Sequence, residues 1–96
     1  MQKEAILDKL RALKPTLKKR FGIEEIALFG SVARDEAHSD SDIDISILKI
    51  RKKDLFLRME AERFLERELG RRVDLGYFDS MRIFIKKAIQ NDITAV

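Results

Sequence analysis

The segment DIDISI, residues 42–47, constrains the fold more than any other part of the sequence. Isoleucine occupies every second position, and a period of two residues places the three isoleucines on one face of a β-strand, toward a core. Asp42 and Asp44 then stand side by side on the opposite face, about 7 Å apart at their Cα atoms. Two carboxylates at that spacing repel each other, and Asp is a poor strand former. A ligand that compensates this repulsion is one of two explanations for the pair.

A hard divalent cation would convert the repulsion between Asp42 and Asp44 into attraction. Carboxylate oxygens suit Mg²⁺ or Mn²⁺ better than softer metals, and Mg²⁺ usually completes its shell with water and substrate phosphates. The alternative is a half-buried edge strand with a solvated acidic face. The Asp-x-Asp pattern alone favours that alternative, because the pattern is short and common.

The second half of the pattern is Gly30-Ser31, which is followed by ten residues and then Asp42. The apolar run 26–29 reads as a short buried strand that ends at the glycine, and residues 32–37, which follow Ser31, are compatible with a helix. Glycine allows the backbone to approach a ligand closely, and a helix start offers N–H groups and a hydroxyl to an anion. Without the aspartates, an ordinary turn with a helix cap is the better interpretation. Together, the two halves predict a phosphate site beside a metal site.

Gly30-Ser31, Ala33-Arg34 and Ser41-Asp42-Ile43-Asp44 together resemble the signature of the DNA polymerase β-like nucleotidyltransferase superfamily. The short length resembles its minimal nucleotidyltransferase (MNT) branch, often the antitoxin half of HEPN–MNT toxin–antitoxin pairs. The resemblance covers nearly the whole chain and departs from the family at Asp35, where members often have Gly. It implies an α/β fold, a small mixed β-sheet of three or four strands with helices packed against it. It also implies a single minimal nucleotidyltransferase domain over residues 1–96.

The resemblance adds a third carboxylate, Asp74, to the metal site. Residues 71–77 read as a strand with Asp74 facing outward, but its register beside Asp42 and Asp44 is implied by the resemblance and not by spacing. By the same resemblance, the three aspartates hold two Mg²⁺ ions, with Mn²⁺ as an alternative metal. Asp74 is then either a metal ligand or a proton acceptor.

Gly30, Ser31 and Arg34 are the expected phosphate-binding residues, and ATP is the expected nucleoside triphosphate. Arg34 lies three residues after Ser31, so on a helical turn it could point to the same anion; an ion pair with Asp35 or Glu36 is the alternative. The implied reaction moves AMP from ATP to a hydroxyl and releases pyrophosphate. The family context suggests a tyrosine of a partner HEPN toxin as the acceptor, since the chain leaves no room for an acceptor-binding domain.

Composition bounds the remaining function classes. The chain has no cysteine, which excludes disulfides, thiolate metal sites and cysteine nucleophiles and fits a reducing cytoplasm. No apolar run approaches the roughly 20 residues of a membrane span, and the N-terminus lacks the apolar core of a signal peptide. We therefore expect a cytoplasmic protein without a membrane partner. The net charge of +3 fits nucleotide, nucleic acid or an acidic partner.

Helices are predicted on both sides of the central segment. The first spans residues 3–20 and should kink or split at Pro15. The second spans residues 54–69, with a core face that Phe56 and Met59 are expected to widen; the core face itself consists of Leu57, Ala61, Phe64, Leu65 and Leu69. A third helix is expected over residues 81–90, and residues 93–96 form a last short strand or a tail.

Two rival functions remain open beside nucleotidyl transfer to a protein. The first is a non-catalytic antitoxin that neutralises its partner by complex formation alone. The second is an RNA-directed nucleotidyltransferase that holds a 3′ end with the basic segments 14–20, 51–53 and 71–72. The basic runs have no interleaved aromatic residues, which disfavours the RNA reading.

Overall fold

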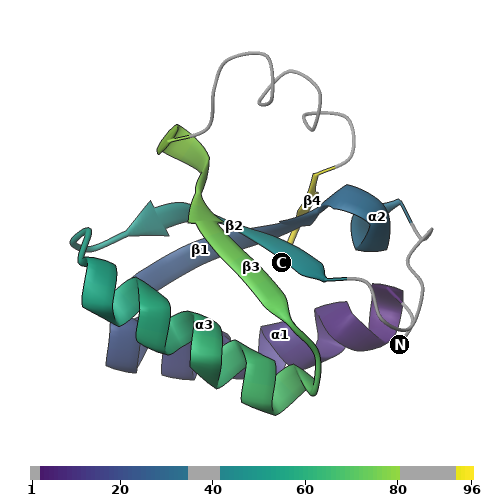
Figure 1. The fold of residues 1–96 in the computed structure, drawn as a ribbon, viewed down its shortest axis with the longest axis horizontal. Helices are drawn as coiled ribbons and strands as arrows, with labels where there is room; N and C mark the ends of the chain where they lie inside the picture. Colours follow the sequence, from purple (N-terminus) through teal and green to yellow (C-terminus); the bar gives the residue numbers. More distant parts are fainter. Residues whose placement is uncertain (1–2, 35–41, 81–92) are drawn as a thin grey trace.

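The computed structural model of the protein describes residues 3–34, 42–80 and 93–96, and Figure 1 shows the arrangement of its elements. These residues form two long helices, one single-turn helix, a 3₁₀ turn and four strands. Their bounds are α1 Lys3–Phe21, β1 Ile23–Phe29, α2 Gly30–Ala33, β2 Ile43–Ile50, α3 Leu55–Leu69, β3 Val73–Tyr77, η1 Phe78–Ser80 and β4 Thr94–Ala95.

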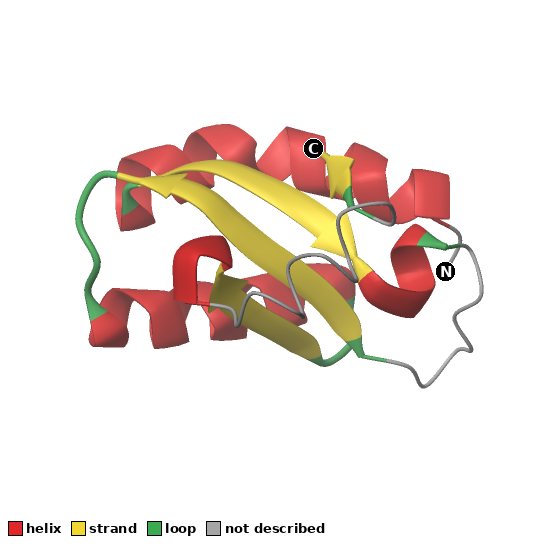
Figure 2. Cartoon of the chain, turned by 90° about the horizontal axis from the view of Figure 1, so that it is seen from above, coloured by secondary structure: helices red, strands yellow, loops and turns green. Residues whose placement is uncertain are grey.

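The four strands form one mixed sheet in the order β3-β2-β1-β4. β1 is antiparallel to both β2 and β4, whereas β2 and β3 are parallel. The crossover between the two parallel strands is α3, which lies beside α1 against the same face of the sheet (Figures 1 and 2). This arrangement confirms the predicted α/β fold with a small mixed sheet.

The alternation of isoleucine with polar residues in β2 separates a buried face of the sheet from the face that carries Asp44. Ile43, Ile45 and Ile47 are buried in the core that α1 and α3 cover, as predicted. Asp44 is half-buried and belongs to the opposite face, because successive strand residues point to opposite sides. The chemistry-bearing face of the sheet is therefore the one that the two long helices leave uncovered.

The prediction that Phe56 and Met59 widen the core face of α3 is wrong. Their side chains are 77% and 39% exposed. At about 100° per residue, these two positions lie on the side of the helix away from Ala61 and Leu65, which pack on the sheet. Their apolar character is therefore not explained by the core of this chain.

The first helix also differs from the sequence-based expectation. α1 runs without interruption from Lys3 to Phe21, although Pro15 lies inside it. Proline removes a single backbone donor, and four buried apolar residues of α1, Ile6, Leu7, Leu10 and Leu17, fix the helix on both sides of Pro15. The expected helix over residues 81–90 lies outside the described residues, and the expected last strand is present as β4.

Side chains of α3 occupy the outer edge of β3, which is an edge strand. The backbone N–H groups of Val73 and Leu75 donate to the carboxylates of Glu66 and Glu62 at 3.1 and 3.0 Å. The Leu75 carbonyl accepts a bond from Arg58 at 2.8 Å. These bonds satisfy edge groups that would otherwise be open to another strand, and they fix β3 relative to α3. No helix among the described residues is long and apolar enough to cross a membrane.

The start of α3 depends on one capping bond. The side chain of Asp54 accepts from the Leu57 backbone N–H at 3.1 Å, which satisfies one of the donors left free at a helix start. Asp54→Ala should lower the free energy of unfolding by about 1 kcal/mol. Denaturant titration would measure the loss, with the exposed Asp8→Ala on α1 as the control. An unchanged midpoint for Asp54→Ala would contradict the capping role.

Candidate active site

The parallel pairing of β2 with β3 brings two aspartates into register. Asp44 and Asp74 are direct partners across the two strands. Neighbouring strands lie about 4.8 Å apart, and paired residues point to the same face, so both carboxylates belong to the face opposite α1 and α3. Asp42 precedes β2 by one residue. The structure thus places Asp44 beside Asp74, with Asp42 directly before β2 at the same end of the sheet.

The electrostatics of Asp44 reflect this gathering of like charge. Its pKa is raised above the ordinary value, chiefly by burial and then by the negative charges of Asp74 and Asp42, while the positive charge of Arg34 opposes the shift. Burial and neighbouring carboxylates both disfavour the charged form of an acid. A cation bound among these carboxylates would relieve both effects, so the donor set fits a hard divalent metal.

The turn that follows β1 contacts the same carboxylate. Phe29, the last residue of β1, pairs with Asp44 across the sheet, and Gly30 begins α2 directly after it. Gly30 has a φ of 75°, in the left-handed region. A Cβ atom at this position would overlap Asp44 Oδ2 and lie only 3.2 Å from its Cγ. Only glycine therefore allows the turn to approach the carboxylate this closely.

The remaining predicted phosphate-binding residues are Ser31, within α2, and Arg34, directly after it. Ser31 lies in the single turn of α2, and the Arg34 N–H donates to the Gly30 carbonyl at 3.1 Å where the turn ends. The positive charge of Arg34 lowers the pKa of Asp44, so this arginine lies near the carboxylate site. The backbone around Gly30, the cation of Arg34 and the carboxylates of β2 and β3 thus form one locality.

Arg72 also lies in this locality, and no pattern in the sequence indicates its place there. Its Nε lies 3.3 Å from Asp42 Oδ1, in an ion pair whose arginine is 81% exposed. Arg72 directly precedes β3, and its carbonyl accepts from the Ile43 N–H at 2.9 Å. Within residues 3–34, 42–80 and 93–96, no three carboxylate or imidazole groups are already gathered for a metal ion. The Asp42 carboxylate, which is directed to Arg72, would have to turn toward Asp44 to join a metal site.

Comparison with known proteins identifies the relatives of the chain. A sequence profile described as "Nucleotidyltransferase domain" matches residues 10–96. Protein adenylyltransferase MntA of Thermococcus cleftensis is 40% identical over 93 residues, which cover 97% of this chain and 94% of that protein.

Solved structures show the same relationship. A structure of a minimal nucleotidyltransferase superimposes with a TM-score of 0.76 and 28% identity, and the match covers 100% of this chain and 95% of the other. A toxin–antitoxin structure with AMP-PNP gives a TM-score of 0.74 at 27% identity, covering 92% of this chain and 69% of that one. A structure of the MntA–HepT toxin–antitoxin gives 0.60 at 25% identity, covering 97% and 67%. The chain therefore belongs to the nucleotidyltransferase domain family, in its minimal nucleotidyltransferase branch, and is a nucleotidyltransferase.

Proposed function

We propose that this enzyme transfers AMP from ATP to a hydroxyl group of a protein partner. The observation that carries the proposal is the pairing of Asp44 with Asp74 across β2 and β3, with the Gly30 turn held against Asp44. The 40% identity to protein adenylyltransferase MntA supports AMP as the transferred group and protein as the acceptor.

The proposed roles follow from the chemistry of each group. Asp42, Asp44 and Asp74 would hold two divalent cations, Mg²⁺ or Mn²⁺, which supply charge stabilisation for the α-phosphate and lower the pKa of the attacking hydroxyl. Asp74 is more exposed than Asp44, so it is the carboxylate that an incoming hydroxyl could reach as a proton acceptor.

The triphosphate would bind on the side of Asp44 that faces the Gly30 turn. The backbone turn at Gly30 and Ser31 would contact the β- and γ-phosphates, and Arg34 would contribute a positive charge there. The acceptor oxygen attacks the α-phosphorus, the bond from that phosphorus to the bridging oxygen breaks, and pyrophosphate leaves with the electron pair. The hydroxyl proton passes to Asp74 or to solvent.

We propose a HEPN-type toxin as the partner and one of its tyrosines as the acceptor, so that modification would make this chain an antitoxin. The likeness to toxin–antitoxin structures, one of them with AMP-PNP, supports this assignment. In the proposed mechanism, neither the three aspartates nor the Gly30 turn acts as the nucleophile. A tyrosine hydroxyl on a separate molecule would take that role.

Two labelled forms of ATP test the reaction. The protein would be incubated with its co-encoded HEPN partner, Mg²⁺ and ATP labelled at either the α- or the γ-phosphate, with an Asp42→Asn/Asp44→Asn variant in parallel. We expect label on the partner only from the α-position, and none with the variant. Label from the γ-position alone would mean phosphoryl transfer and would refute the mechanism. No label from either, with the partner still bound, would favour an antitoxin that acts by binding alone.

The Arg72 ion pair gives a separate prediction about metal affinity. Arg72→Ala should release the Asp42 carboxylate and remove a competing positive charge, so Mn²⁺ should bind more tightly. The gain should be at most about fivefold, because an exposed ion pair contributes roughly 0.2–1 kcal/mol. Electron paramagnetic resonance of free Mn²⁺ would measure it. Lys49→Ala, which breaks an exposed pair with Glu24, is the control. Weaker Mn²⁺ binding by Arg72→Ala would show that Arg72 supports the site.

A further inference from the structure

The outward side of α3 carries apolar side chains that no part of the described structure covers. Leu55 is 61% exposed, Phe56 77% and Met59 39%. At about 100° per residue, the three fall within an arc of roughly 100°, so they form one continuous surface. This surface faces away from Ala61 and Leu65, which pack on the sheet. Adjacent exposed apolar side chains of this size mark interaction sites more often than isolated ones do.

The same side of α3 carries charged side chains toward its C-terminal end, and Glu60 and Glu66 lie there beside two arginines. Arg63 and Arg67 follow Met59 by one and two turns and are both exposed. Together with the three apolar side chains, they make up what we call the outer α3 face: Leu55, Phe56, Met59, Arg63 and Arg67. Protein interfaces are enriched in aromatic residues, Met and Arg, and the outer α3 face has this composition.

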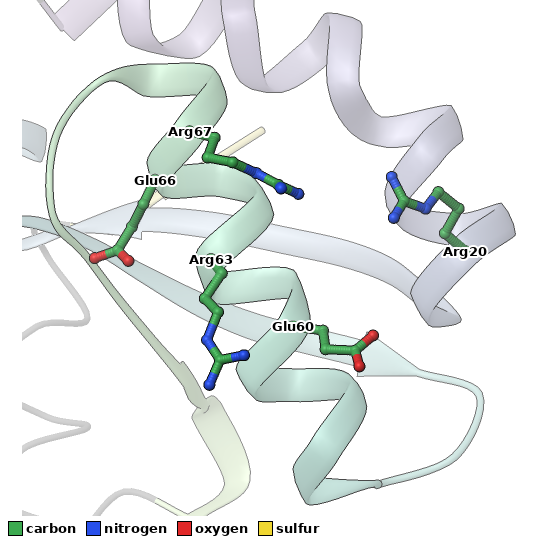
Figure 3. Close-up of a pocket in the computed structure, with 5 residues that line it drawn as sticks. All are labelled: Arg20, Glu60, Arg63, Glu66 and Arg67. Atoms are coloured by element: carbon green, nitrogen blue, oxygen red, sulfur yellow. The ribbon is translucent and has the colours of Figure 1, made fainter.

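A hollow of about 600 Å³ adjoins this face and is lined from two helices, α1 and α3. Figure 3 shows Arg20 of α1 and Arg67 of α3 extending toward each other across it. The guanidinium of Arg20 lies 5.0 Å from the Phe21 ring centroid and 5.2 Å from that of Phe64, so two rings fix its position.

In the part of the chain that the structure describes, the arginines of this region have no carboxylate partner. Among the described residues, no carboxylate lies within ion-pair distance of Arg20, Arg63 or Arg67. Glu66, which also lines the hollow, is bonded to the Val73 N–H, while Glu60 is exposed at its rim. Three guanidinium groups that form no ion pair with the neighbouring Glu60 and Glu66 would gain from an acidic partner that approaches over the apolar surface.

We infer that the outer α3 face, with Arg20, is the docking surface for a protein partner whose contacting surface combines apolar side chains with carboxylates. This inference rests on the proposed function for the existence of such a partner. Charge complementarity disfavours a second copy of this chain as the occupant, because a self-contact would oppose two surfaces on which three arginines outnumber the exposed carboxylate of Glu60. A nucleic acid would satisfy the arginines but would leave the aliphatic surface of Leu55 and Met59 without apolar contacts.

The docking surface and the proposed active site lie on different sides of the molecule. α3 covers one face of the sheet, whereas Asp44 and Asp74 belong to the other. A partner held on α3 therefore leaves the carboxylates open to nucleotide, and the acceptor hydroxyl must reach them from an extended segment or from another subunit. Binding of the partner and binding of nucleotide should thus respond to different substitutions.

The test measures the affinity of the purified co-encoded HEPN partner for variants of the full chain by titration calorimetry. Phe56→Ala should weaken binding about 30-fold or more, as an interface hot spot does. Arg67→Glu should weaken it about tenfold or more, with a slower association rate. Leu48→Ala on β2 and Arg11→Glu on α1 are matched controls at exposed positions and should bind as the wild type does. Thermal stabilisation by Mg²⁺ and ATP should be the same in all four variants.

The outcomes separate this inference from the proposed function. If Phe56→Ala and Arg67→Glu bind the partner as tightly as the wild type, the docking surface is wrong whether or not AMP is transferred. If they lose binding while α-label never appears on the wild-type complex, the docking surface stands and the proposed activity fails. Two other results would also overturn the inference. In both, the partner does not bind through Phe56; instead Phe56 is needed for dimerisation of the wild-type chain or for binding of a single-stranded RNA 12-mer.

Discussion

Asp44→Asn is expected to abolish nucleotidyl transfer while it stabilises the metal-free protein. Loss of a residue outside the first metal shell already costs 10- to 100-fold in metal affinity or activity, so loss of a central carboxylate should reduce transfer by at least about 100-fold. In the absence of metal, however, Asp44 is a half-buried charge beside Asp74 and Asp42. Replacing it with a neutral side chain of nearly the same shape removes that repulsion and the burial penalty of a charge.

The sign of the stability change follows from the raised pKa of Asp44. Because the folded state holds the proton more tightly than the unfolded state, the stability of the wild type falls as pH rises from the unfolded pKa through the raised, folded pKa. Above the folded pKa, the charged Asp44 lowers the stability of the folded state by its full amount. The melting temperature of Asp44→Asn should therefore exceed that of the wild type at neutral pH in EDTA, and the difference should shrink in acid.

Ligand addition should reverse the order of the two proteins. At a Mg²⁺–ATP concentration 100 times the dissociation constant, the wild type should gain about 2.7 kcal/mol and Asp44→Asn almost nothing. Differential scanning fluorimetry in EDTA and in Mg²⁺–ATP measures both effects on the same samples. A variant that is less stable than the wild type in EDTA would show that Asp44 supports the fold, and would contradict the assignment of its charge to ligand binding.

How far the sequence could predict this site depends on the range of the interactions involved. The alternation in β2 is local, so the buried face of Ile43, Ile45 and Ile47 followed from the sequence. The partnership of Asp44 with Asp74 is not local, because it depends on how α3 packs and on the bonds from Glu62 and Glu66 to the edge of β3. No spacing rule contains that register, and the resemblance supplied it.

The wrong prediction for Phe56 and Met59 and the unpredicted Arg72–Asp42 ion pair also depend on interactions that are not local in the sequence. Phe56 and Met59 were expected in the core because they are apolar, but their angular position on α3 turns them to solvent. The Arg72–Asp42 ion pair joins two chain segments thirty residues apart through the parallel pairing, so no local pattern signalled it. In both cases the role of the side chain depends on the assembly of strand and helix, which residue type and local spacing do not determine.

Gly30→Ala is the second substitution with a large expected effect, and Gly70→Ala is its matched control. Both glycines have a left-handed φ, 75° and 68°. Each alanine should therefore cost about 1–2 kcal/mol of stability from the backbone alone. The surroundings differ: a Cβ at Gly70 would meet nothing within 4 Å, whereas a Cβ at Gly30 would overlap the Asp44 carboxylate.

The comparison thus isolates the close approach of the turn to Asp44. Gly30→Ala has to displace either the carboxylate or the α2 backbone, and active-site misplacement of about 1 Å can cost 100-fold in rate. We expect a loss of about 100-fold in α-label transfer for Gly30→Ala and none for Gly70→Ala at a temperature where both remain folded. Circular dichroism would establish that temperature.

If the two variants retained equal transfer, Gly30 would matter only for its backbone conformation, and the phosphate-binding role of the turn would have to be abandoned. If only Gly30→Ala lost transfer and its Mn²⁺ affinity fell with it, the displaced group would be the Asp44 carboxylate; with Mn²⁺ affinity retained, it would be the phosphate-binding backbone.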